Sequence, residues 1–170
     1  MANTFQLIAS STVGSGGAAA IDFTSIPGTY KDLCIVASVR TDRPSQSYSN
    51  MKIKFNTSTS NITGRFLRTI DTGVENYPAS AAEWGAPGSS ATSNTFGNAF
   101  IYIPNYAGSN DKSVSIDSVI EQNTLNQFSY LSAGLWSQSA AITSLSLYSS
   151  DSSTLLVQHS TAYLYGVKNV

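Results

Sequence analysis

The only histidine in the chain is His159, so any catalysis that depends on histidine must use it. A Ser-His-Asp site needs a nucleophile held in a suitable geometry, and no G-x-S-x-G segment occurs in the sequence. In an extended segment, Leu155 and Val157 lie on the same side as His159, which predicts a partly buried structural histidine near a strand end. The sequence therefore does not favour histidine chemistry.

Acidic and sulfur-containing side chains offer little more. The ten acids are spread along the chain, and neither a D-x-D-x-D calcium loop nor an H-E-x-x-H zinc helix is present. Glu75, Glu83 and Glu121 are the most obvious candidates if the fold assembles a carboxylate pair of the kind that glycoside hydrolases use. Cys34 is the single cysteine, so it excludes an intrachain disulfide and a multi-cysteine zinc site, and its apolar neighbours predict an inert buried thiol. We expect no enzymatic activity, no cofactor and no metal site.

Aromatic residues provide a candidate contact surface. They surround a stretch rich in Gly, Ala, Ser, Pro and Thr, and exposed rings on the rim of a β-domain can stack on sugars or contact a neighbouring subunit. The alternative is that they close the ends of the fold, because aromatic side chains bury a large area wherever they pack. The candidates are Tyr77, Trp84, Phe96, Tyr102 and Tyr106.

Composition narrows the classes of protein further. Charged residues make up 11% of the 170 residues and the net charge is -1, which argues against nucleic acid or an anionic membrane as a partner. No basic signal region and no stretch of about 20 apolar residues is present, so we expect a soluble protein of cytosolic origin. A surface built from Ser, Thr, Asn and Gln suits strands better than helices.

The elements that would position these residues are strands. Residues 33–40 alternate between apolar and mixed side chains after a Pro27-Gly28 turn, and Met51, Ile53 and Phe55 alternate with two lysines. Further short strands are indicated at 5–11, 18–23, 99–103, 114–122, 128–136, 142–148 and 155–167, separated by polar turns.

Three segments are harder to assign. Ile62, Phe66 and Ile70 fit one face of a short helix, but alternation over 66–70 and the presence of a glycine favour a strand. Val114 and Ile116 occupy one alternating set of positions and Val119 the other, so a β-bulge is predicted near Asp117 and Ser118. Residues from about 71 to 98 are expected to form a long irregular insertion. We predict one domain over 1–170 in the all-β class: an antiparallel β-sandwich of jelly-roll type with little helix.

Both ends of the chain resemble a group of small proteins encoded by tailed bacteriophages, especially marine and cyanobacterial ones. The recurring features of that group are an F-x-x-I-P-x-x-Y-x-D-L turn, an R-T-D triplet, a K-F-N strand and a closing Y-L-Y-G-I-K-N. In this chain the corresponding residues are Phe23, Ile26, Pro27, Tyr30, Asp32 and Leu33, then Arg40 to Asp42, Lys54 to Asn56, and Tyr163 to Asn169 with Val167 in place of isoleucine.

The resemblance implies a non-enzymatic structural protein of the virion, assembled in the host cytoplasm, and brings no catalytic residues. We expect a capsid decoration (cement) protein that binds the major capsid protein and its own copies, as a homotrimer, and stabilises the head. The alternative is a tail-fibre or head-fibre adhesin that binds a host surface glycan through the rim aromatics.

Overall fold

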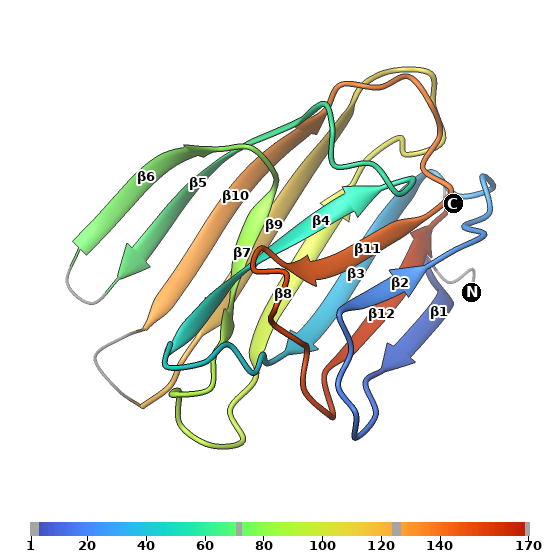
Figure 1. Cartoon of the computed structure of the whole chain (residues 1–170). Coiled ribbons are helices and arrows are strands. Elements are labelled where there is room, and N and C mark those ends of the chain that lie inside the picture. The colour runs from blue at the N-terminus through green and yellow to red at the C-terminus, as the bar shows by residue number, and fades with distance from the viewer. Residues whose placement is uncertain (1–3, 71–72, 124–126, 169–170) are drawn as a thin grey trace.

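The computed structural model describes residues 4–70, 73–123 and 127–168, and within these ranges the chain forms twelve strands and no helix. The strands make two stacked sheets of unequal size (Figure 1). The larger sheet has the order β1 (Phe5–Thr12), β12 (Thr161–Val167), β3 (Asp32–Val39), β8 (Gly97–Ile103), β9 (Lys112–Ile120), β10 (Phe128–Trp136), β5 (Ile62–Ile70) and β6 (Gly73–Ala79). The smaller sheet has the order β2 (Ala20–Phe23), β11 (Leu145–Ser149), β4 (Tyr48–Phe55) and β7 (Glu83–Pro87).

All of the strand pairs are antiparallel, and several of them are nested. Strand β3 pairs with β12, β4 with β11 and β5 with β10. Successive strands of the first half therefore pair, in reverse order, with strands of the second half, and these pairs belong alternately to the larger and the smaller sheet. The chain is thus an all-β sandwich, as predicted, and the nested pairing is compatible with the jelly-roll type.

The main core lies between the two sheets. In β3, Leu33, Ile35 and Val39 are buried, whereas Val36 points to the opposite face and is 42% exposed. In β4 of the smaller sheet, every second residue from Met51 to Phe55 is buried in the same cluster. The alternation that predicted these two strands therefore also identifies the faces that they bury.

A second apolar cluster fills the inner face of the larger sheet where the smaller sheet ends. Phe66, Ile120, Phe128 and Tyr130 form it. The guanidinium of Arg68 lies 5.6 to 5.9 Å from the centroids of the three rings. Its Nε also donates to Glu75 at 2.6 Å, so the charge is paired. Arg68 thus covers these aromatic rings together with Tyr48 of β4, whose ring centroid lies 4.5 Å from that of Phe128.

Two of the segments that carry the phage resemblance meet in space. The Tyr30 ring lies over Gly166, where an added Cβ would be 2.2 Å from the ring carbon Cγ. The amide of Lys31 donates to the carbonyl of Val167 at 2.8 Å, and the hydroxyl of Tyr106 donates to the carbonyl of Pro27. The turn before β3 is therefore fixed against the C-terminal strand β12.

The structure corrects several predictions. Residues 73–79 and 83–87 form β6 and β7, so the prediction of an irregular insertion over about 71–98 is wrong there, and residues 71 and 72 lie outside the described residues. The pairing of β9 with β10 runs without a register shift, so no bulge occurs near Asp117. The bulge in the larger sheet lies in β1 instead, between Leu7 and Ala9. The prediction of a strand over 62–70 is confirmed.

The faces of β3 predict a clear difference in stability between two neighbouring positions. Ile35→Ala should lower the free energy of unfolding by about 2 to 5 kcal/mol, because it leaves a cavity in the core. Val36→Ala, the matched control one residue away on the exposed face, should change it by less than about 0.5 kcal/mol. Chemical denaturation of both variants measures the two values, and equal effects would contradict the assignment of faces.

The contact between Tyr30 and Gly166 predicts an energetic coupling. Gly166→Ala should destabilise the protein by about 1 to 3 kcal/mol, because the new methyl group overlaps the ring. In a Tyr30→Ala background the same substitution should cost at least about 1 kcal/mol less, since the ring is absent. A double-mutant cycle by urea denaturation provides the test, and additive effects would show that the two residues do not interact.

Candidate functional site

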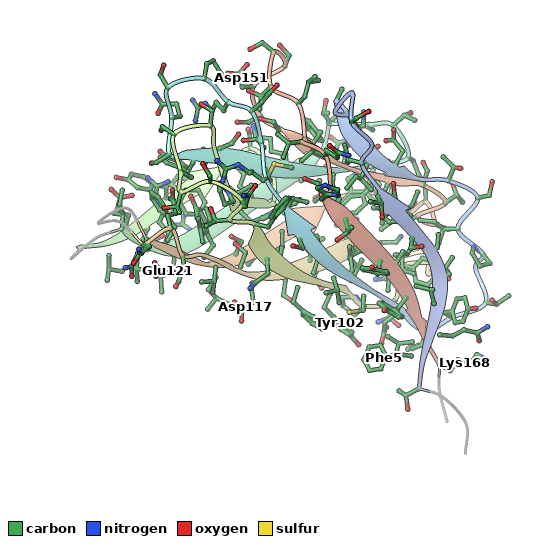
Figure 2. All side chains as sticks on the ribbon, turned by 90° about the horizontal axis from the view of Figure 1, so that it is seen from below. Phe5, Tyr102, Asp117, Glu121, Asp151 and Lys168 are labelled. Carbon is green, nitrogen blue, oxygen red and sulfur yellow. The ribbon has the colours of Figure 1, made fainter. Side chains whose placement is uncertain are left out.

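The outer face of the larger sheet is the most extensive candidate site. The smaller sheet packs on the inner face, and side chains on the outer face point away from it; Phe5, Tyr102, Asp117 and Glu121 mark this side in Figure 2. Asp151, in contrast, lies on the side of the smaller sheet.

Large apolar side chains are concentrated on this face. All eleven exposed large hydrophobic residues of the described chain lie on the larger sheet, and none lies on the smaller one. The strand register places ten of them on the outer face and leaves Tyr77 on the inner side of β6. The ten are Phe5, Leu7, Val36, Leu67, Val74, Phe100, Val119, Leu131, Leu135 and Tyr163.

The register also aligns several of these residues in one row across the strands. Tyr163 pairs with Val36, and Val36 pairs with Phe100. Leu131 and Leu67 are paired in the same way on β10 and β5. Between these two apolar groups, Asp117 of β9 pairs with both Phe100 and Leu131. The face therefore has two apolar areas separated by one carboxylate.

Two shallow hollows lie on this face, one in each apolar area. The first, of about 230 Å³, is lined by Phe5, Cys34, Val36, Phe100 and Tyr165. Cys34 is only 1% exposed at its base, and burial raises the pKa of its thiol to about 11. The predicted buried thiol is confirmed.

The second hollow, of about 260 Å³, lies between β5, β9 and β10. Leu67 and Leu131 supply its apolar side, and the exposed Asp117 lines it as well. Apolar hollows next to protruding side chains suit the insertion of side chains from a partner protein.

The size of this face matches that of a protein–protein interface. Eight strands about 4.8 Å apart, with about seven residues each at roughly 3.3 Å per residue, cover on the order of 900 Å². A stable interface of standard size buries about 800 Å² on each partner. Ten large apolar side chains exposed on one face of this size are unusual on an isolated soluble protein and mark an interaction site.

The five aromatic residues that the sequence suggested do not form one surface. Trp84 and Tyr106 are fully buried, so the prediction that they belong to a contact surface is wrong for these two. Tyr77 lies on the edge strand β6, with its ring centroid 5.9 Å from that of Phe66. Tyr102 lies on the outer face and donates to Asp32 at 2.5 Å, a hydrogen bond that raises the pKa of the phenol to about 12. Phe96 lies at one end of the sandwich, just before β8.

The other residues considered for catalysis are dispersed. Glu75 is paired with Arg68 at 2.6 Å, and Glu83 with Lys52 at 3.3 Å. His159 is exposed in the loop before β12 and not partly buried as predicted. Among the described residues, no group of three or more His, Cys, Asp or Glu side chains is placed to hold a metal ion.

Comparison with known proteins assigns no relationship. The chain matches no protein-family model, and the search of curated proteins finds no significant match. Within the described part of the chain, no helix has the length and apolar character that a membrane crossing requires.

The outer-face residues were missed at the level of sequence, although a signal was present. In 33–39 and 97–103, apolar residues occupy both alternating sets of positions, and Val36 and Phe100 belong to the second set. A strand that is apolar on both faces is typical of a sheet covered on both sides. Here one of these faces is left uncovered, which is the property that defines the site.

The raised pKa of Cys34 predicts that its thiol reacts slowly with disulfide reagents. At pH 8 the folded protein should react with a disulfide reagent at least about 100-fold more slowly than the urea-unfolded chain, because little thiolate exists when the pKa is about 11. Absorbance of the released thiolate follows both rates. A native rate close to the unfolded one would mean that the hollow does not shield the sulfur.

Proposed function

We propose that this protein is a non-enzymatic structural protein of a bacteriophage virion, a decoration protein that binds the head shell through the outer face of its larger sheet. The observation that carries the proposal is that ten large apolar side chains are exposed on one face, whose total extent of about 900 Å² is large enough for a stable interface. The resemblance of both chain ends to small phage proteins supplies the identity of the partner as the major capsid protein.

Charge on this face specifies the complementary surface. Asp117 and Glu121 are exposed on or next to β9, and Arg65 is exposed on β5. We infer that the shell protein presents an apolar surface with a basic residue opposite Asp117. Such pairing fixes the orientation of two apolar surfaces that would otherwise slide against each other.

Contacts between copies of the protein form the second part of the proposal. Strand β6 is an edge of the larger sheet and carries Val74, 68% exposed, and Tyr77, 48% exposed. An edge strand with unpaired backbone groups and exposed apolar side chains is a natural site of subunit contact. We assign the contacts of the expected homotrimer to this edge, Val74 included, which leaves the rest of the outer face free for the shell.

A binding role without catalysis agrees with the interactions of the three glutamates that were considered as catalytic acids. Glu75 and Glu83 are held in ion pairs with bases on neighbouring strands, and the carboxylate of Glu121 accepts the amide of Asn123 at 2.6 Å. These interactions give each of the three acids a structural partner.

Quantitative mass spectrometry of purified particles tests the location. A decoration protein should be present in hundreds of copies per head, whereas a handful of copies located on the tail would favour the fibre adhesin and refute the decoration role. Size-exclusion chromatography with light scattering on the isolated protein reports whether it forms trimers.

Substitutions on the outer face test the binding surface itself. Phe100→Ser and Leu131→Ser together should reduce binding to undecorated shells at least tenfold, because they remove apolar area from both halves of the row. Asp22→Ser, an exposed change on β2 of the smaller sheet, is the control and should bind as the original protein does. Co-sedimentation with shells measures the binding, and a double variant that binds normally would exclude this face.

A further inference from the structure

A hollow at one end of the sandwich lies where three neighbouring strands begin or end. Strand β3 lies between β12 and β8 in the larger sheet and runs antiparallel to both. The end of β3 is therefore next to the segments that lead into β8 and β12. Side chains from these three places line a hollow of about 420 Å³: Arg40, Asn94, Phe96, Val157, Gln158 and His159.

Arg40 makes one wall of the hollow rigid. Its Nη1 donates to the carbonyl of Thr92 at 2.8 Å and to that of Thr95 at 3.1 Å, and its Nη2 donates to the carbonyl of Ala91 at 3.1 Å. Phe96 follows this segment directly, so the guanidinium fixes the backbone that presents the ring. A site held in its binding geometry loses less entropy when a ligand binds.

The guanidinium also leaves the hollow positively charged. Its hydrogen-bond acceptors are neutral carbonyl and hydroxyl groups, and none of the residues that line the hollow carries a carboxylate. Since Nη1 and Nη2 of Arg40 already donate to carbonyl and hydroxyl groups, the main contribution of this side chain to the hollow is its charge. An anionic ligand is thereby favoured over a neutral one.

The remaining polar side chains of the lining are available to a ligand. Asn94, Gln158 and His159 are exposed, and their side chains make no hydrogen bond to another described residue. His159 has a φ of 73°, in the left-handed region, which is costly for residues other than glycine.

We propose that this hollow binds a sugar ring that carries an anionic group, such as a uronic acid. The half-buried Phe96 and Val157 supply an apolar patch for the carbon face of the ring. The side-chain amides of Asn94 and Gln158 and the imidazole of His159 can form hydrogen bonds with its hydroxyl groups. The volume is within the range of small-molecule sites and exceeds the need of a simple ion. This site lies at the end of the sandwich and is separate from the outer face assigned to the shell, so the two proposals can fail independently.

Titration with simple probes tests the site. Methyl glucuronide, methyl glucoside and sodium sulfate should be added separately to the ¹⁵N-labelled full chain while amide shifts are recorded. Methyl glucuronide should shift the amides of Asn94, Phe96 and Gln158 and bind at least about threefold more tightly than methyl glucoside. Sulfate that binds as tightly as the glucuronide would reduce the hollow to an anion site and overturn the proposal, and so would the absence of shifts with both sugars at 50 mM.

Variants of the lining separate binding from folding. Phe96→Ala should weaken binding of methyl glucuronide about tenfold. His159→Gly should weaken it as well while the thermal midpoint rises or stays the same, because glycine tolerates the left-handed backbone. Phe100→Ala, an exposed aromatic change on the outer face, is the matched control and should bind as the original chain does. Unchanged binding in both Phe96→Ala and His159→Gly would overturn the assignment.

Discussion

The packing of a four-stranded sheet on an eight-stranded one is the constraint on which the remaining features depend. Burial of the inner face supplies the main core, from Leu33 and Ile35 of β3 to Met51 and Phe55 of β4. Four strands do not cover all of an eight-stranded sheet, and at the margin of the smaller sheet Arg68 lies over the aromatic rings beside Tyr48 of β4. The outer face has no such cover. The unequal sizes of the two sheets thus lead directly to the candidate site.

The residues that carry the resemblance to phage proteins maintain the fold. Tyr30 packs on Gly166, Arg40 binds the carbonyls of the segment before β8, and Asp42 accepts the amide of Leu155 at 2.7 Å. Each of these contacts joins segments that are distant in the sequence. The resemblance therefore bears first on architecture, and the surfaces that we assign to partners are formed mostly by other residues.

Alternation predicted the fold well where one side of a strand is apolar and the other polar, as in β4. It failed in β7 because close approach between the sheets selects small residues there, and in β6 because this edge strand is largely exposed and has no buried apolar face. At Gly85 an added Cβ would be 2.5 Å from Ile120, and at Gly134 it would be 2.6 Å from the Cβ of Ala82. Glycine and alanine in such positions have the composition of a loop. Ser118 is buried on the inner face of β9, which produced the false signal of a bulge.

The candidate site was harder to predict than the fold, because exposure depends on what the rest of the chain leaves uncovered. Alternation places Val36 on the mixed face of β3, opposite Ile35, but it does not reveal that this face is left uncovered. Aromatic type was also a poor guide: the large rings of Trp84 and Tyr106 fill the interior, whereas Phe100 and Tyr163 are at the surface. The hollow near Phe96 combines segments about sixty residues apart, and only the strand order brings them together.

The bonds made by Arg40 have a consequence for the order in which the molecule opens. They connect residue 40 to carbonyls about fifty positions later, so they can form only after β3 and β8 have paired. The segment 89–95 contains no strand, and single hydrogen bonds hold it: Arg40 binds its carbonyls, and the amides of Ser89 and Ser90 donate to the loop before β4. Local fluctuations should therefore release this corner at a lower free energy than any strand of the core, and its amides should exchange with solvent while the two layers are still intact.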